Sequence, residues 1–426
     1  MRIGLLTQWY EPEPGPASLP GVLARGLAAR GHDVRVVTGF PNYPTGRVMP
    51  GYRISRRLDE VTDGVRVRRV ALYPSHDSSA PRRLANYGSF ALSALLSGTD
   101  VLRDVDVLWV YNSPITVALP MWYVRHVRRV PVVLHVADLW PDSVTASGFL
   151  EGWPGRAAVE RAMHGWCRGM YRSAERVAHL SPGAAGLLRR RGVPAEKLVH
   201  IPMWGDEPPP GRPTDLRAEL GLDSDHVVLV YAGALGEAQG LEALVDACAL
   251  VEDPRLVCLI AGSGVTEDRL RDRVARSGVG NVRFLGRLPR ERMPALLATG
   301  DAHVVSLRPT PMAPYTMPSK VQTILAAGRA LLVAAEGDAA AVARESGAGL
   351  TARPGDPESI AEAVRELCRL GREKLHLLGR TGRDYYDRTF TVALGVARVE
   401  AALREAMAAG HRRKAPRRSE KTTTKS

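Results

Sequence analysis

The 426-residue chain lacks the features typical of membrane-spanning, secreted and zinc-binding proteins. No apolar run approaches the roughly 20 residues that a spanning helix needs, and no N-terminal segment has the basic, apolar and small-residue order of a signal peptide. His164 precedes Cys167 by three residues, but no second ligand pair accompanies them, so no zinc site is expected. We therefore expect a cytoplasmic protein whose four cysteines, none in a CxxC pair, are reduced and mostly buried: Cys167, Cys248, Cys258 and Cys368.

The net charge of +13 is not accompanied by a nucleic-acid-binding motif. Because there is no zinc finger, no RNP-like aromatic motif and no basic recognition helix, nucleic acid is excluded as an expected partner. About six of the charges lie in residues 411–426, a low-complexity basic tail that is predicted to be disordered. Two interpretations of this tail stay open, namely simple solvation and contact with an anionic membrane.

The chain is too long for one core, and its 45% hydrophobic and 24% charged content is ordinary for a globular protein. Strand and helix patterns alternate, stop at the Pro- and Gly-rich stretch 203–213, and then restart. Such alternation predicts doubly wound parallel sheets of the α/β class, here two Rossmann-like domains facing a cleft. The expected parts are an N-terminal Rossmann-like domain at 1–203, a second Rossmann-like domain at 204–384, a crossover helix at 385–410 that packs back on the N-terminal domain, and the tail at 411–426.

The alternation also predicts individual elements, and ligands of such sheets bind at the carboxyl ends of the strands. Strands are expected at 2–9, 34–40, 65–73, 105–111, 130–140, 176–180, 198–202, 227–232, 256–261, 282–285, 302–307 and 330–335. Helices are expected at 19–29, 241–251, 266–275, 291–298, 319–327, 357–370, 372–388 and 392–408.

The stretch 315–329 is the most informative piece of the sequence. A polar turn leads into a short helix with Pro318 at its expected first position, where a missing N–H costs nothing. Ser319 and Lys320 then fall in the first turn, where free backbone N–H groups and the helix dipole favour an anion. This pattern predicts a diphosphate site without a P-loop.

Three further loops of the second half follow strands and contain glycine. Gly233 and Gly236 follow the first strand, Gly262 and Gly264 the next, and Gly286 the one after, with Arg287 and Leu288 positioned to offer backbone groups to a base. An ordinary strand-to-helix loop is the alternative for each alone. Because parallel strands bring all these loops to one edge, together they predict a nucleotide site beside Lys320.

The first half carries the candidate acceptor residues. Gly15 and Pro16 follow the first strand, and Asn42 and Tyr43 follow the second. Asp138 follows an apolar strand, where a carboxylate can polarise an acceptor hydroxyl.

Three other features of the first half have two readings each. His135 is either an acceptor contact or a buried structural histidine, and Asp142 either belongs to the site or caps a helix. The apolar segment 82–96 is either a core helix or a membrane-surface helix that admits a lipid-linked acceptor.

The combination QWYEPEPG, TGFPNYPTGR, NYGSFALSALL, DLWPDS, YAG-LG-AQGLE and PSK-AAGR resembles glycosyltransferase family 4, and within it the colanic-acid and O-antigen branch. The resemblance covers nearly the whole chain up to the tail. It implies the GT-B fold, retaining sugar transfer from a nucleotide donor, often a UDP-sugar, and no metal or other cofactor. It implies donor contacts from Gly15, Gly233, Ala234, Gly236, Gln239, Gly262, Gly264, Gly286, Arg287, Leu288, Tyr315, Pro318, Ser319, Lys320 and Thr323.

The sequence departs from the family pattern at several of these positions. Tyr315 and Thr323 stand where many members carry glutamates, the second of which usually contacts ribose. Ala234 and Gln239 replace a common arginine and lysine, and Ala137 stands where many relatives place a histidine. Either Lys320 and its helix N-terminus therefore do more of the catalytic work, or the donor is an unusual one.

The resulting hypothesis is a retaining glycosyltransferase with Lys320 and Asp138 as catalytic residues and a sugar, lipid-linked or small-molecule acceptor. A non-catalytic nucleotide-sugar-binding subunit is one alternative, motivated by the departures above. A sugar-nucleotide 2-epimerase is another, for which Glu11, Glu13 and His135 offer a poor acid and histidine set. The expected location is cytoplasmic, with peripheral contact at the inner membrane face through the tail and the segment 82–96.

Overall fold

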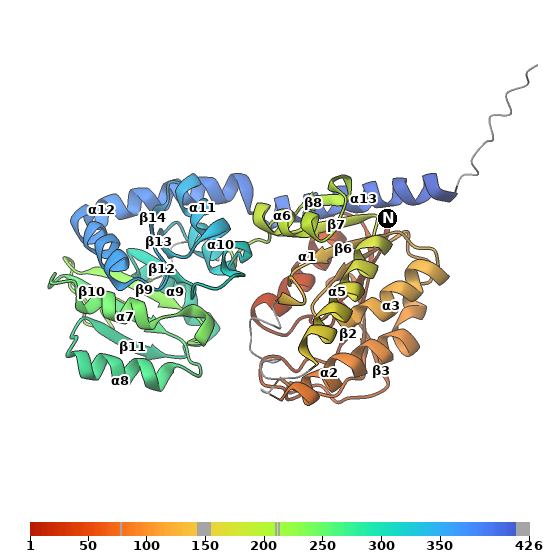
Figure 1. Ribbon diagram of the computed structural model, residues 1–426, viewed down its shortest axis with the longest axis horizontal. Helices are drawn as coiled ribbons and strands as arrows, with labels where there is room; N and C mark the ends of the chain where they lie inside the picture. The colour runs from red at the N-terminus through yellow and green to blue at the C-terminus, as the bar shows by residue number, and fades with distance from the viewer. Residues whose placement is uncertain (77–78, 143–154, 209–210, 212–213, 415–426) are drawn as a thin grey trace, which may run out of the picture. The chain divides into compact units, whose positions relative to one another are not determined.

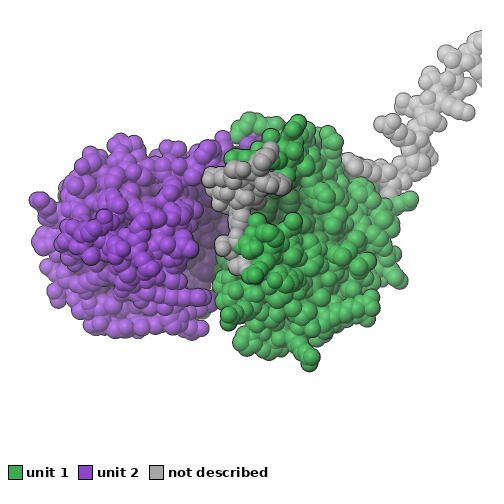
Figure 2. Space-filling model, turned by 60° about the horizontal axis from the view of Figure 1, so that its bottom comes forward, with its two compact units in different colours: residues 1–180, 188–201, 396–426 green, residues 181–187, 202–395 purple. Residues whose placement is uncertain are grey.

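The computed structural model describes residues 1–76, 79–142, 155–208, 211 and 214–414, and the chain divides into two compact units (Figures 1 and 2). Unit 1, green in Figure 2, comprises Met1–Leu180, Leu188–Ile201 and Val396–Ser426. Unit 2, purple, comprises Ser181–Leu187 and Pro202–Gly395. The C-terminal helix α13 (Val392–Lys414) thus belongs mostly to unit 1, although it is far from the rest of that unit in sequence.

Unit 1 is built on an eight-stranded sheet. All neighbouring strands are parallel except the edge pair β3 and β4. The sheet reverses its winding direction between β1 and β5, and such a switch point is where open α/β sheets bind ligands. In spatial order the strands are β3 (Arg57–Thr62), β4 (Val65–Val70), β2 (Asp33–Gly39), β1 (Arg2–Leu6), β5 (Val107–Tyr111), β6 (Val132–Val136), β7 (Arg176–His179) and β8 (Leu198–His200).

The central strands β5 and β6 are almost wholly apolar on both faces, because helices cover both faces of such a sheet. Every residue of β5 and β6 is buried, whereas β3 is mostly exposed. The helices of this part of the chain are α1 (Leu19–Ala29), α2 (Ala80–Ser93), α3 (Ala118–Trp122), α5 (Arg156–Ser173) and α6 (Pro182–Arg190).

Unit 2 has a six-stranded, wholly parallel sheet with its switch point between β9 and β12. The order is β11 (Val282–Gly286), β10 (Leu256–Ala261), β9 (Val227–Ala232), β12 (Ala302–Ser306), β13 (Ala330–Ala334) and β14 (Gly349–Ala352). The helices are α7 (Glu242–Ala249), α8 (Glu267–Ser277), α9 (Met293–Thr299), α10 (Ser319–Ala326), α11 (Gly337–Glu345) and α12 (Pro357–Thr389).

The prediction of two doubly wound sheets is confirmed, with several differences in detail. The sequence analysis missed β3 and β14, an exposed edge strand and a four-residue strand whose patterns are weak. The expected break between residues 370 and 372 is confirmed, since Gly371 has φ +72° and joins two helices within α12.

The helix predicted at 392–408 begins where expected, but it ends later than predicted. Helix α13 begins at Val392 and continues to Lys414, four residues into the segment predicted as a disordered tail. Residues 415–426 lie outside the described part of the chain. Among the described residues, none of the helices is both long and apolar enough to cross a membrane.

Candidate functional site

Lys320 lies in the first turn of α10, as predicted, and its side chain reaches the loop that follows β9. Its ammonium nitrogen donates a hydrogen bond of 2.6 Å to the hydroxyl group of Tyr231 and lies 4.0 Å from the centre of that ring. The side chain also passes so close to Gly233 that a Cβ there would lie 2.5 Å from the ammonium nitrogen. Because the side chain is largely desolvated, the pKa of Lys320 is lowered to about 8.

The N-terminus of α10 is open to an anion. Pro318 occupies the N-cap, one position earlier than predicted, and it has an extended backbone. Within the described residues, no side chain caps this end of the helix. The first N–H groups of α10, including those of the exposed Ser319 and of Lys320, therefore add positive potential beside the Lys320 ammonium group.

The glycines predicted to cradle a diphosphate pack the loops against one another. A Cβ on Gly262, whose φ is +143°, would lie 1.8 Å from the carbonyl oxygen of Gly233, and one on Gly264 would lie 2.3 Å from that of Leu235. Gly286 accepts a hydrogen bond from the N–H of Gly262. The predicted convergence of these loops at one sheet edge is therefore present, and glycine is required there by close backbone contact.

Most backbone N–H groups of the loop after β9 already have partners inside the protein. The N–H group of Gly233 donates to the Ala261 carbonyl at the end of β10, that of Leu235 donates to the Ser263 carbonyl in the next loop, and that of Gly236 donates to the Gln239 side chain. Those of Gln239 and Gly240 close the short turn at 237–239. The expectation that this loop offers a row of free N–H groups to phosphate therefore needs correction. Lys320 and the N-terminus of α10 remain as the groups that can bind a phosphate.

The remaining predicted donor-binding residues differ in their exposure and in their hydrogen-bond partners. The carbonyl oxygen of Ala234 accepts a hydrogen bond from Tyr231, and the hydroxyl oxygen of Thr323 accepts one from the Asp206 N–H. Arg287 is exposed, and Leu288 packs on the core of unit 2. Tyr315 ends a short 3-10 helix of residues Ala313–Tyr315.

Two residues near this edge were missed by the sequence analysis. Tyr231 reads as an ordinary core residue because it ends an apolar strand, and only the fold shows its contact with Lys320. Arg308 follows β12 and pairs with Glu237 at 2.9 Å, while its N–H donates to the Ala238 carbonyl. The signal that could have revealed Arg308 is a cation placed directly after a buried parallel strand.

In unit 1, the carboxylate of Glu13 joins the two predicted acceptor loops. It accepts hydrogen bonds from the N–H groups of Asn42 and Tyr43, both at 2.8 Å, and of Tyr10 at 3.1 Å. Glu13 is 2% exposed, and this burial raises its pKa. Gly15, with φ +65° and open space around it, begins the 3-10 helix Gly15–Ser18 that also contains Pro16.

Asp138 lies just beyond β6 and is partly buried, which raises its pKa. Asn112 orients this turn, because its side-chain oxygen accepts the Ala137 N–H at 2.8 Å and its amide donates to the Asp138 carbonyl at 3.3 Å. The carboxyl group of Asp138 also interacts with the Ser113 hydroxyl, which opposes the rise in pKa. A carboxylate held in this way after a parallel strand is suited to accept a proton or a hydrogen bond.

Two predicted acceptor residues are corrected by their burial. His135 is 1% exposed, packs against Trp109 and Tyr111, and has a pKa lowered to about 3. It is therefore a neutral core histidine and is not open to an acceptor. Asn42 is also 1% exposed, and its amide donates to the Phe40 carbonyl. Its role is to shape the loop.

The residues that motivated an epimerase or a helix cap have structural partners. Glu11 pairs with Arg25, and Glu13 and His135 are buried as described. Asp142 pairs with Arg191, whose guanidinium also donates to the Trp140 carbonyl at 2.7 Å. The acid and histidine set of an epimerase is therefore not assembled by these residues.

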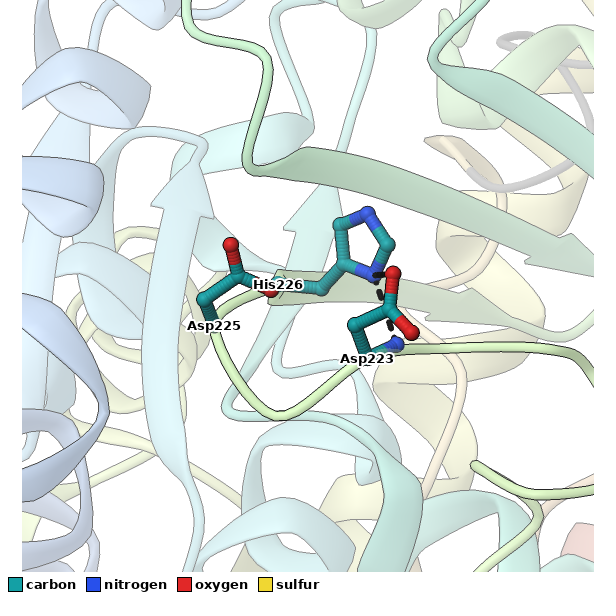
Figure 3. Close-up of side chains that lie close together, drawn as sticks. All are labelled: Asp223, Asp225 and His226. Atoms are coloured by element: carbon teal, nitrogen blue, oxygen red, sulfur yellow. Dashed lines mark hydrogen bonds and ion pairs between the residues drawn. The ribbon is translucent and has the colours of Figure 1, made fainter.

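Asp223, Asp225 and His226 form the one group of His and acidic side chains with metal-ligand spacing in the described residues (Figure 3). The group precedes β9, so it lies at the sheet edge opposite to the Gly233 loop. His226 Nδ1 already accepts a hydrogen bond of 2.8 Å from the Asp223 N–H (Figure 3). These residues are therefore not placed to assist at the predicted donor site.

Comparison with known proteins gives concordant matches along the chain. Residues 15–204 match the family described as glycosyl transferase 4-like domain, and residues 213–385 match glycosyl transferases group 1. The putative colanic acid biosynthesis glycosyl transferase WcaI of Escherichia coli (strain K12) is 29% identical over 334 residues, which cover 77% of this chain and 81% of that protein. The probable glycosyltransferase WbjE of Pseudomonas aeruginosa is 24% identical over 311 residues, or 72% and 76% of the two chains.

Solved structures agree in fold. Anabaena Alr3699/HepE in complex with UDP has a TM-score of 0.69 and 17% identity, covering 95% of this chain and all of that one. WaaG, a glycosyltransferase involved in lipopolysaccharide biosynthesis, has a TM-score of 0.65 and 16% identity over 94% and 98%. The family matches and the sequence relatives confirm the resemblance seen in the motifs and the expectation of an enzyme. The chain belongs to the glycosyltransferases of the GT-B fold, in the branch of the colanic-acid and O-antigen biosynthesis enzymes.

Proposed function

We propose that this glycosyltransferase moves a sugar, with retention of anomeric configuration, from a UDP-sugar to a hydroxyl group of a sugar, lipid-linked or small-molecule acceptor. The observation that carries the proposal is the Lys320 ammonium group, held beside the loop after β9 at the uncapped N-terminus of α10. A fixed cation and free helix N–H groups suit a diphosphate. The Anabaena protein crystallised with UDP supports this choice of nucleotide.

The donor diphosphate lies, in this proposal, against Lys320 and the first N–H groups of α10. The switch point between β9 and β12 brings the loop containing Gly233 and the segment leading to α10 together at one edge. The base is assigned to the segment 286–288, next along the same edge. Because Thr323 is engaged with the linker, no ribose contact is assigned to it.

The proposed chemistry is transfer on the front face of the sugar. The bond between the anomeric carbon and the diphosphate oxygen breaks, and the acceptor oxygen bonds to the same carbon on the same face. The acceptor proton passes to the departing phosphate oxygen, while Lys320 and the helix N-terminus stabilise its negative charge. Asp138 is assigned to orient the acceptor hydroxyl, and no metal is required.

Unit 1 is assigned to the acceptor through its loops at Gly15 and Tyr43. A lipid-linked acceptor is supported by α2 and the residues just after it, where Leu84, Leu92 and Leu96 are 66%, 54% and 69% exposed. Phe90 on the same helix is fully buried, so α2 combines a core face with exposed leucines. We assign peripheral contact with the inner membrane face to these leucines and to the basic tail.

The test is donor turnover by the Lys320→Ala variant with a UDP-sugar and an acceptor. Loss of this charge-stabilising group is expected to cut turnover by about 10²-fold without unfolding the protein. Lys374→Ala is the matched control, because Lys374 is an exposed lysine of the same unit in α12. Undiminished turnover in Lys320→Ala would refute the proposal, and NMR of the product tests retention. Incubation with donor alone separates transfer from epimerisation, and turnover in EDTA tests metal independence.

A further inference from the structure

Unit 1 contains a pocket of about 720 Å³ that plays no part in the sites described above. It lies between α5 and the segment 190–197, which connects α6 to β8. None of the described residues that line it is acidic. Its basic lining residues are His164, Arg168, Arg172, Arg190, Arg191 and Lys197.

Two of these cations form no ion pair with any residue that the structure describes. Arg168 and Arg172 are exposed and stand four residues apart, on one face of α5. Like charges at this spacing disfavour a helix. Among the described residues, neither guanidinium group forms an ion pair. Their placement side by side is therefore a cost to the free protein that a bound anion would remove.

The other side of the pocket is held in place by internal hydrogen bonds. Lys197 donates to the carbonyl oxygens of Tyr171, Arg172 and Ala174 at 3.3, 3.0 and 2.7 Å, which closes the C-terminal end of α5. Arg191 is fixed by Asp142 and by the Trp140 carbonyl. These two cations are structural, and Lys197 holds the connecting segment against the C-terminal end of α5.

Tyr171 also lines the pocket, but its hydroxyl group is buried. The residue is 4% exposed, and among the described residues its hydroxyl group has no hydrogen-bond partner other than the Cys167 thiol. A thiol is a weak acceptor, so the buried O–H group lacks a strong partner. Burial raises the Tyr171 pKa, so the phenol stays neutral and adds no negative charge beside the arginines.

We propose that this pocket binds a phosphate-bearing ligand through Arg168 and Arg172. The planar fork of arginine matches two phosphate oxygens, and a dianion would satisfy both uncompensated guanidinium groups at once. All the lining residues belong to unit 1, and none of them is among the residues assigned to the donor site in unit 2. The same chemistry is offered by a soluble phosphate ester and by a phosphorylated lipid headgroup.

The experiment uses the full chain with the Lys320→Ala change, which weakens phosphate binding at the donor site. Inorganic phosphate and pyrophosphate are titrated by calorimetry against sodium chloride of equal ionic strength. The pocket variant is Arg168→Gln with Arg172→Gln. The matched control is Arg103→Gln with Arg161→Gln, which removes the same charge from exposed positions of unit 1 outside the pocket. The pocket variant is expected to bind at least about tenfold more weakly, and the control is expected to bind as the parent does.

Vesicles of phosphatidylcholine with and without phosphatidic acid identify the source of the phosphate. Cosedimentation that needs phosphatidic acid and is lost in the pocket variant assigns a lipid headgroup, and calorimetric binding without cosedimentation assigns a soluble ester. The proposal is overturned if the parent binds neither probe, or if the pocket variant and the control lose binding equally. Thermal unfolding of both variants shows that the comparison is made on folded protein.

Discussion

The ammonium nitrogen of Lys320 and the hydroxyl oxygen of Tyr231 lie 2.6 Å apart, and the same hydroxyl donates to the Ala234 carbonyl at 2.6 Å. Tyr231 thus links the proposed diphosphate cation to the loop after β9. Burial raises the Tyr231 pKa, so the phenol remains neutral. The phenol therefore orients Lys320 and adds no charge of its own.

Replacing Tyr231 with Phe should lower turnover by about tenfold, since a hydrogen bond to a charged group contributes about 1.5–3 kcal/mol. The ring remains in place, so the core should be preserved. The pH profile of turnover should also shift, because Lys320 loses a partner. Tyr385→Phe is the control, since that exposed hydroxyl contacts Glu345 away from Lys320. Equal kinetics and an unchanged pH profile for Tyr231→Phe would contradict a positioning role.

Affinity for UDP should fall as the pH rises above 8. The Lys320 pKa in the free protein is about 8, below its ordinary value of 10.5, and a diphosphate binds the charged form. Protonated lysine therefore becomes scarce above pH 8, and affinity should drop about tenfold between pH 7 and pH 9. At pH 8 each UDP should take up about half a proton, which calorimetry in two buffers of different ionisation enthalpy measures.

Lys320→Arg provides the contrast, since arginine stays charged throughout this range. Its UDP affinity should be nearly independent of pH from 7 to 9, whatever its absolute value. A wild-type affinity that stays constant above pH 8, or proton release at pH 8, would count against Lys320 as the diphosphate cation.

Gly262→Ala should disrupt the loops of the donor site. Its Cβ would lie 1.8 Å from the Gly233 carbonyl oxygen, and both partners are backbone, so one loop must move. Overpacking and the positive φ together should cost about 3 kcal/mol or more, and UDP binding should be lost. Gly278→Ala also has a positive φ, but no atom lies within 4 Å of the added Cβ, so only about 1–2 kcal/mol is expected. Similar melting temperatures for the two variants would show that the loop contact is unimportant.

Glu13→Ala should destabilise unit 1 by about 3 kcal/mol or more, because it leaves three backbone N–H groups without their acceptor. Glu196→Ala, an exposed change in the same unit, should have little effect. Chemical denaturation measures both. If the two variants unfold alike, the carboxylate does not hold the loops at Tyr10 and Asn42 together.

Much of the architecture follows from patterns that are local in the sequence. Alternation of apolar strands and amphipathic helices predicts both sheets, because each period reflects the neighbours of a residue along the chain. The turn at Pro318, Ser319 and Lys320 was found in the same way, since a helix start needs only a few consecutive residues. The family motifs are also local and led to the correct enzyme class.

The tertiary structure decided the contacts between residues that are distant in sequence. Only the fold pairs Lys320 with Tyr231. It also engages most N–H groups of the loop after β9 in hydrogen bonds within the protein, and it buries His135 and Asn42 away from any acceptor. It likewise brings Arg168 and Lys197 to one pocket from separate segments. A polar group is available to a ligand only if folding has not already given it a hydrogen-bond partner. Because these partners are distant in sequence, local sequence patterns do not predict which groups stay available.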